Sequence, residues 1–327
     1  MKKFVKYTAI TALVLVVLGV VLLSIGAIGG SVQGIKVMDE VAKKVKAGEF
    51  SIDAEDIEVL GDMGVEIEEW LDELGIEPTF SVNADIKFND NFPVYSGGTI
   101  DLDFDAAEVK KLVFSLATCD VQVKSHEGST LSIDADFAGK MQAFVDGDTF
   151  YVLATNSGVN VSAGDFELQV PEGMTFEEVK FDFGAGSIDI DELQGGEVMV
   201  SVGAGDFNAK KLVADSVILA VGAGDATIRD GVLGDVRAEV GAGNIDITAQ
   251  ITREVKGDVA LGNLTMVVKG SGKGDHNYQV DCAMGEVNVG DYSWAGLATS
   301  DIFINNNAET TYEFNCAMGN IDVRFVE

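Results

Sequence analysis

The sequence predicts an all-β protein, and within that class a parallel β-solenoid (β-helix) built from coils of about 19 residues. The triplet Gly-Ala-Gly begins at Gly184, Gly203, Gly222 and Gly241, so successive copies are evenly spaced along the chain. The chain contains 38 glycines but only 3 prolines, and inner strands avoid proline whereas tight turns need glycine. Residue types alternate with period two on both sides of the triplets, which is typical of strands with one buried face.

The apolar half of this alternation predicts the core. Val198, Val200 and Val202 precede the second triplet, and Phe207 and Ala209 follow it. Glycines between two such strands allow the backbone to bend sharply or to adopt positive φ. Each unit is therefore expected to be two strands joined at a glycine corner. Units are expected to stack, because one coil alone cannot bury its apolar side chains, and the predicted solenoid domain covers residues 80–327.

Residues 1–30 predict a cytoplasmic tip and a transmembrane anchor. No charged residue occurs from Tyr7 to Gly30, and about 20 apolar residues suffice to span a bilayer. The lysines before this run place the N-terminus in the cytoplasm by the positive-inside rule. A signal peptide cleaved near Ala27 is the alternative. The expected localisation is a single-pass cell-membrane protein with its C-terminal domain outside the cytoplasm.

Residues 31–79 are expected to form an acidic, partly helical juxtamembrane stalk. The apolar residues from Ile67 to Leu74 have the i, i+3, i+4, i+7 spacing of a helix face. No lysine or arginine occurs between residues 47 and 86. A solvated spacer and an end-cap for the solenoid both fit this composition.

Composition excludes several classes of function. The chain has 54 acidic residues against 22 lysines and arginines, a formal net charge of −32. Affinity for phosphate backbones comes from clustered basic residues, so a nucleic-acid partner is not expected. Three cysteines in 327 residues cannot form a disulfide framework, and none has the spacing of a zinc site.

A resemblance becomes visible at the strand 112–123, at the segment Val-Pro-Glu-Gly that begins at Val170, and at the glycine triplets. With the preceding apolar segment, these features resemble the bacterial putative-adhesin family of β-strand-repeat surface proteins, over residues 100–327. That family is a domain of unknown function. The resemblance implies membrane-anchored or secreted proteins, often associated with cell-envelope stress systems, and it brings no catalytic residues.

One polar column follows the corners and is a candidate site. Stacked carboxylates about 5 Å apart repel unless they are solvated, hydrogen-bonded or bridged by cations. Turn-stabilising Asx side chains are the other interpretation. The members of this predicted ladder are Asp206, Asp225, Asn244, Asn263, Glu286 and Asn320, with Ser187 before them.

A second candidate is the loop 290–307, which carries Tyr292, Trp294 and Phe303. Aromatic side chains in an exposed loop are suited to contact with carbohydrate or protein. Packing of the same rings against the side of the solenoid is the alternative.

Catalytic and metal chemistry are not predicted. The two histidines, His126 and His276, lie in polar turns and neither is close in sequence to a cysteine. Cys282 and Cys316 occupy the position that valine holds in other coils, so both are expected to face the core, and a disulfide between them is left open. No cofactor is expected.

The sequence therefore predicts a non-catalytic surface binding or structural module. The alternative is a regulatory or sensor partner in a bacterial cell-envelope stress system. Expected partners are the lipid bilayer through the N-terminal helix, and a cell-surface glycan or a membrane protein. A second copy of the chain is a further possible partner, through the edge of the C-terminal coil.

Overall fold

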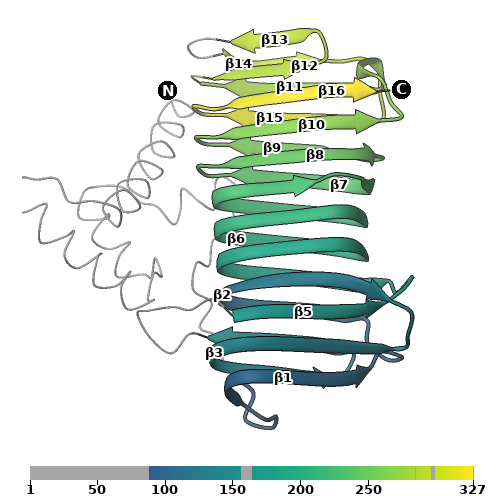
Figure 1. Ribbon diagram of the computed structural model, residues 1–327. Helices are drawn as coiled ribbons and strands as arrows, with labels where there is room; N and C mark the ends of the chain where they lie inside the picture. Colours follow the sequence, from purple (N-terminus) through teal and green to yellow (C-terminus); the bar gives the residue numbers. More distant parts are fainter. Residues whose placement is uncertain (1–87, 156–163, 284, 296–298, 327) are drawn as a thin grey trace, which may run out of the picture.

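The computed structural model describes residues 88–155, 164–283, 285–295 and 299–326, and in these ranges the protein is all-β (Figure 1). All of its strands belong to one 16-stranded sheet. The strands are β1 (Tyr95–Asp105), β2 (Lys111–His126), β3 (Thr130–Asp146), β4 (Thr149–Thr155), β5 (Gly164–Pro171), β6 (Phe176–Ile228), β7 (Gly231–Val240), β8 (Asn244–Ile251), β9 (Val255–Val259), β10 (Asn263–Lys269), β11 (His276–Cys282), β12 (Glu286–Val289), β13 (Tyr292–Ala295), β14 (Thr299–Ile304), β15 (Thr310–Cys316) and β16 (Asn320–Val326), with a short 3₁₀ turn at Lys273–Asp275.

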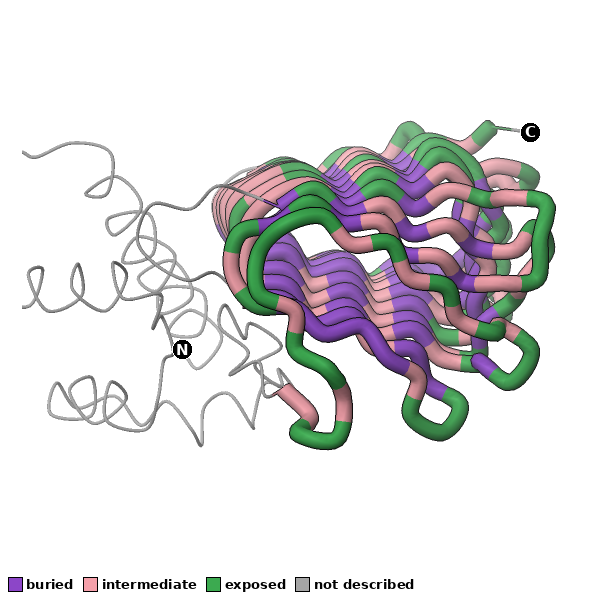
Figure 2. The backbone as a smooth tube through the Cα atoms, turned by 60° about the horizontal axis from the view of Figure 1, so that its bottom comes forward, coloured by how far each residue is buried: buried purple, intermediate pink, exposed green. Residues whose placement is uncertain are grey.

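The sheet folds back at the glycine corners into two faces that enclose the core (Figure 2). Face A consists of β4, β7, β9, β15, β11 and β14, and face B of β1, β5, β8, β10, β16, β12 and β13; β2, β3 and β6 pass over both. The predicted alternation is confirmed, since Val198, Val200, Val202, Phe207 and Ala209 are all buried. Apolar side chains of both faces thus meet in one continuous core.

Parallel pairing at the interval of the sequence repeat organises the middle of the sheet. Leu212 in β6 pairs with Gly231 in β7, and Asn244 in β8 pairs with Asn263 in β10. The corner requires glycine: at Gly224 φ is +149°, and an added Cβ would lie 1.9 Å from the carbonyl oxygen of Gly205. No side chain fits between backbones that approach this closely.

The C-terminal strand pair lies inside the sheet and not at its end. β16 pairs in parallel with β10 on one side and with β12 on the other. β15 lies in the same way between β9 and β11. The chain therefore skips one level to form β11 to β14 and returns to fill the gap (Figure 1). A second copy of the chain could pair at this end only with β13 or β14, because both sides of β15 and β16 are occupied.

The N-terminal part of the sheet is antiparallel in several places. β3 pairs antiparallel with β1, β4 and β5. The segment before β1 crosses face A at Gln142, whose Nε2 donates hydrogen bonds to the carbonyl oxygens of Asn89 (2.8 Å) and Phe92 (2.9 Å). The ring of Phe92 stacks on that of Phe144 at 4.2 Å. These contacts bury an outward-pointing glutamine.

The predicted fold therefore needs correction. The all-β class is confirmed, but a parallel β-solenoid of short, regular coils behind a transmembrane helix and a partly helical stalk is wrong as a description of the whole. Antiparallel pairs occur at both ends, strand order departs from chain order, and the described residues contain no α-helix. The alternation of residue types predicted the strands but not which strands are neighbours. Long connections between strands change that order.

The predicted localisation is corrected as well. Within the ranges that the structure describes, no helix has the length and apolar character needed to cross a bilayer. The predicted anchor at residues 1–30 and the predicted stalk at residues 31–79 lie outside the described residues.

Candidate binding surfaces

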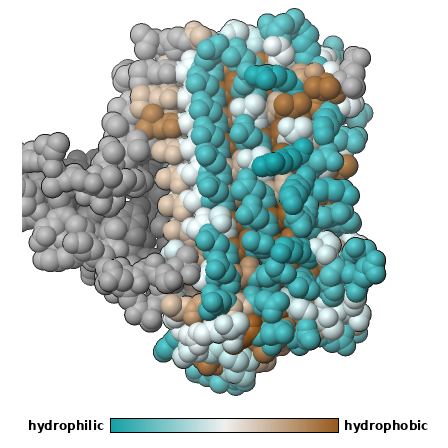
Figure 3. Space-filling view, in the orientation of Figure 1, coloured by the Kyte–Doolittle hydropathy of each residue, from teal (hydrophilic) through white to brown (hydrophobic). Residues whose placement is uncertain are grey.

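The predicted polar ladder runs along face B, next to the glycine corners. Asp225 pairs with Asn244, Asn244 with Asn263, and Asn263 with Asn320. Glu286 follows Asn320 at the end of the column. Figure 3 shows a mostly hydrophilic strip along this face. The structure thus brings all the predicted members into one line.

Hydrogen bonds join the ladder from unit to unit. The side-chain amide of Asn320 donates to Oδ1 of Asn263 (2.9 Å), that of Asn263 to Oδ1 of Asn244 (2.7 Å), and that of Asn244 to Oδ1 of Asp225 (2.7 Å). The backbone N–H of Asp225 donates to Oδ1 of Asp206 (3.3 Å). The interpretation as hydrogen-bonded Asx side chains therefore describes this half of the column.

The column continues into carboxylates that the sequence reasoning missed. Ser187 pairs with Asp120, and its hydroxyl donates to Oδ1 of that residue at 2.7 Å. Asp120 in turn pairs with Asp165, and Asp165 with Asp136. Asp120 could have been found, because it follows the corner before it as Asp206 follows Gly205. Asp165 could have been found too, because it follows Ala163-Gly164 as Asp206 follows Ala204-Gly205. Asp136 could not, because the antiparallel β3 joins the column by a pairing that no repeat signals.

A second acidic column stands beside the first at this end of face B. Asp134 pairs with Asp101 on β1 and with Glu167 on β5. Burial and then the charges of Asp101, Glu167 and Asp103 raise the pKa of Asp134. Lys124 forms an ion pair with Glu167 at 2.5 Å, and this hydrogen bond lowers the pKa of that carboxyl. Lys124 therefore neutralises one carboxylate of a patch that also contains Asp134 and Asp101. The patch leaves this end of face B strongly negative.

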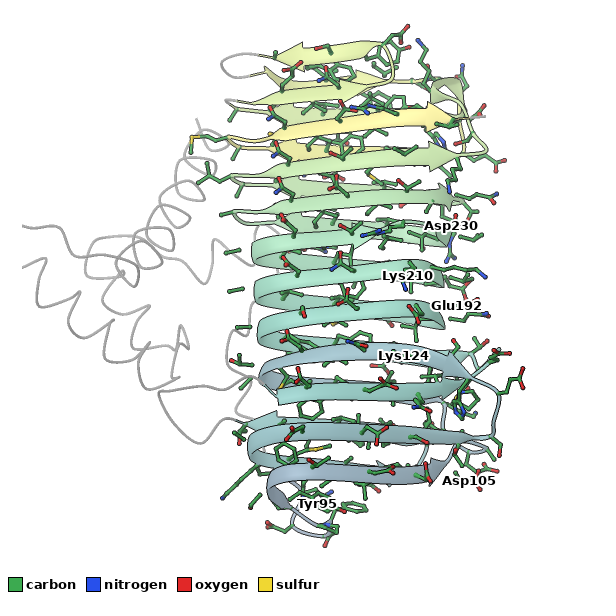
Figure 4. All side chains as sticks on the ribbon, in the orientation of Figure 1. Tyr95, Asp105, Lys124, Glu192, Lys210 and Asp230 are labelled. Atoms are coloured by element: carbon green, nitrogen blue, oxygen red, sulfur yellow. The ribbon has the colours of Figure 1, made fainter. Side chains whose placement is uncertain are left out.

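Ion pairs line the turns on the side opposite the corners. Lys210 pairs with Asp191 (2.5 Å), Lys211 with Glu192 (2.7 Å), and Lys269 with Asp230 (2.8 Å). Figure 4 shows Glu192, Lys210 and Asp230 together on this side. Because these side chains are exposed, each pair contributes little to stability.

Face A presents a different outward column near its middle. Ile218 pairs with Arg237, and Arg237 with Lys256. Arg237 also forms an ion pair with Glu239 at 2.5 Å. Outward positions of this face thus mix apolar, basic and acidic side chains, whereas those of face B are mostly polar and acidic.

The predicted aromatic contact loop is divided between two surfaces. Tyr292 and Trp294 stand opposite the buried Val289 and Val287 and pack, half-buried, against the core. The Nζ of Lys273 lies 4.7 Å from the centre of the Tyr292 ring. Phe303 pairs with Gln279 on face A and is 59% exposed. The three aromatic residues therefore do not form one contact surface.

The two histidines, predicted to lie in polar turns, lie at strand ends: His126 ends β2, and the buried His276 begins β11. His126 Nε2 lies 2.8 Å from the carbonyl oxygen of Thr130. His276 is buried between the Oγ1 of Thr310 (2.7 Å from Nδ1) and the Oγ of Ser271 (3.1 Å from Nε2), and burial lowers its pKa. Among the residues that the structure places, no group of three or more His, Cys, Asp or Glu side chains could hold a metal ion.

Several solved structures are similar to parts of this chain. A protein from Bacteroides fragilis described as a putative adhesin has 11% identity and a TM-score of 0.33, and the match covers 70% of this chain and 98% of that one. A putative cell adhesion protein from Clostridium sporogenes has 14% identity and a TM-score of 0.26, covering 69% and 99%. A putative lipid binding protein from Parabacteroides distasonis has 11% identity and a TM-score of 0.27, covering 69% and 97%.

The comparison with protein families is informative. No curated protein matches the chain. The family model described as Toastrack DUF4097 matches residues 151–324, which is more than half of the chain's 327 residues. This match covers the repeat units and the C-terminal strands, which are most of the region whose motifs resemble the putative-adhesin family, and that resemblance is confirmed. The chain therefore belongs to the Toastrack DUF4097 family.

Proposed function

We propose that the protein is a non-catalytic binding module that presents face B to a macromolecular partner, either a cell-surface glycan or another protein. The observation that supports this function best is the hydrogen-bonded polar column of face B. Its side chains stand about 4.8 Å apart along the sheet and are tied from unit to unit, as Asn263 is to Asn244. Such an array is pre-organised, so little side-chain entropy is lost when a partner binds.

The acidic end of face B favours a partner with cationic groups. Asp120, Asp165 and Asp136 follow one another along the column, and Asp101 and Asp134 stand beside them. Opposite charges across an interface increase the association rate and select among partners. A protein with basic side chains or a polymer with amino groups meets this requirement.

The positions of three strongly perturbed groups favour a role without catalysis. Burial raises the pKa of the Cys119 thiol to about 12 and raises the pKa values of Tyr278 and Tyr312. All three side chains lie in the core, where a substrate has no access. Active sites instead place perturbed groups in a cleft.

Proximity labelling in the host, from the full-length chain, tests this function. The variant combines Asp120→Asn, Asp136→Asn and Asp165→Asn on face B. Its matched control makes the same change in charge on face A, with Glu178→Gln, Glu197→Gln and Asp235→Asn. We expect the face B variant to lose the envelope components that the wild-type chain labels, and the control to keep them.

Two results would contradict the proposal. Equal labelling by the wild-type chain and both variants would show that face B does not bind the partner. Labelling of a single membrane protein, unchanged by the face B variant, would favour the regulatory or sensor partner of an envelope stress system instead. Circular dichroism of the purified variants checks that both keep the fold.

A further inference from the structure

Two cysteines stand next to each other in the core at the level of the corners. Cys282 on β11 and Cys316 on β15 are Cα partners in a parallel pair. Their exposed fractions are 1% and 0%, and both thiols are free. The third cysteine, Cys119, pairs with Gly186 and Gly164 at the other end of the sheet. The pair is therefore isolated from the remaining thiol.

The same position is apolar in the other repeat units. Val202, Val221, Val240 and Val259 fill it there, and all four are buried. Both cysteines begin the sequence Cys-Ala-Met-Gly, where the regular units have Val-Gly-Ala-Gly. The Sγ of Cys316 lies 3.0 Å from the carbonyl oxygen of Gly319. Cysteine thus replaces valine at this position only in β11 and β15, which are neighbours in the sheet.

The two thiols also affect each other's pKa. A hydrogen bond from Cys316 lowers the pKa of Cys282 to about 7. The same hydrogen bond, followed by burial, raises the pKa of Cys316. Because the thiolate is the reactive form of cysteine, Cys282 is the attacking thiol of the pair.

We propose that Cys282 and Cys316 form a reversible thiol–disulfide site that latches the inserted C-terminal strands to the outer strands of the sheet. Neighbouring strands lie about 4.8 Å apart, and this spacing falls within the range of about 4.4–6.8 Å between the Cα atoms of disulfides. The bond would connect β15 to β11 and close a loop that contains β12, β13 and β14.

A low-molecular-weight disulfide is the oxidant. The Cys282 thiolate attacks one sulfur of the small disulfide, whose S–S bond breaks and releases one thiol. The thiol of Cys316 then loses its proton and attacks the Cys282 sulfur, which releases the second thiol. The protein loses two S–H hydrogens, and the small disulfide is reduced to two thiols.

Access to the pair is from the end of the sheet. Cys282 pairs on its other side with Thr299 in β14, the outermost strand of face A. The pairing of β14 with β11 changes register between Val280 and Cys282. Separation of this short, irregular strand would expose Cys282 without unfolding of the rest of the sheet.

Oxidation of the folded full-length chain with oxidised glutathione tests the latch. After denaturation in an alkylating reagent, we expect the number of free thiols to fall from three to one, with a peptide that links Cys282 to Cys316. The oxidised protein should unfold at a higher temperature than the reduced one, because the bond closes a long loop, and dithiothreitol should reverse the shift.

Valine variants are the matched controls, since valine already occupies this position in other units. Cys119→Val should still form the bond, whereas Cys282→Val and Cys316→Val should not, and circular dichroism verifies that each is folded. Retention of all three thiols by the folded wild-type chain would overturn the proposal. So would a stable mixed disulfide with glutathione, or a bond that involves Cys119.

Discussion

Asn320 lies directly beside Asn263, a residue 57 positions earlier in the chain, and its side-chain amide donates a hydrogen bond of 2.9 Å to the Asn263 Oδ1. The side-chain amide of Asn263 donates a similar hydrogen bond to the Oδ1 of Asn244 (2.7 Å). The inserted strand β16 thus continues the polar column that runs through β8 and β10. A hydrogen bond between side chains therefore accompanies the register in which β16, the last strand of the chain, pairs with β10.

The substitution Asn263→Ala tests the contribution of this column to stability. It removes the hydrogen bonds to Asn320 and Asn244. Because the side chains are exposed, we expect a total loss of about 1 kcal/mol in the free energy of unfolding, near the lower limit for two bonds. Urea unfolding measures it, with Thr265→Ala on the same strand as control. Equal losses in the two variants would contradict a role for the column.

Tyr312 and Tyr278 give opposite predictions for the same chemical change. Both side chains are fully buried. The Tyr278 hydroxyl donates to the carbonyl oxygen of Lys273 at 2.6 Å, whereas the Tyr312 hydroxyl is the one buried side-chain polar atom within the described residues that has no partner. We expect Tyr312→Phe to raise the free energy of unfolding by about 1 kcal/mol and Tyr278→Phe to lower it by a similar amount.

Thermal and urea unfolding of the two tyrosine variants decide this prediction. Each variant serves as the control for the other, because both remove one hydroxyl from a buried ring and leave the volume nearly unchanged. A loss of stability in Tyr312→Phe would mean that its hydroxyl is satisfied in solution.

Gly224→Ala tests how closely the corners pack. The new Cβ would lie 1.9 Å from the carbonyl oxygen of Gly205, at a residue whose φ is +149°. We expect a loss of at least about 3 kcal/mol in the free energy of unfolding, because the backbones of two units must separate. Gly274→Ala is the control, since nothing lies within 4 Å of its added Cβ. A tolerated alanine at residue 224 would show that the corner can move.

The repeat was enough to predict the inward face, the corner and the spacing of successive units. These features depend on local properties: alternation decides which side chains point inward, and glycine decides where the chain turns. Val202 and Val221, which precede successive triplets, are both buried as predicted. The polar ladder followed from the same spacing, and the structure places its members Asn244 and Asn263 side by side.

The order of the last strands could not be predicted in this way. Alternation assigns a strand to a face, but it does not choose between two neighbours of similar sequence. Asn263, Glu286 and Asn320 each precede an inward-pointing apolar residue. By this pattern, the strand that begins at Glu286 and the strand that begins at Asn320 fit equally well beside Asn263. The pairing settles the order, because β16 lies between β10 and β12, and β15 lies between β9 and β11.

His276 provides a prediction about pH. Burial lowers its pKa from the usual value of 6.5, and the nearby charge of Asp275 partly opposes this shift. The unfolded chain therefore binds the proton more tightly than the folded one. The stability due to neutral His276 is fully present above a pH of about 6.5 and is lost as the pH falls below that value towards the lower pKa of the folded state.

We expect the free energy of unfolding of the wild-type chain to fall relative to that of His276→Gln as the pH is lowered from about 7.5 to about 5, a range that includes the histidine pKa. The variant loses the stacking on Tyr312, which lies 4.2 Å away in the wild type, so its stability is lower throughout. Only the difference in slope reports the titration, because carboxylates such as Asp134 titrate alike in both proteins. If the slopes of the wild type and His276→Gln agreed, His276 would titrate alike in the folded and unfolded chains.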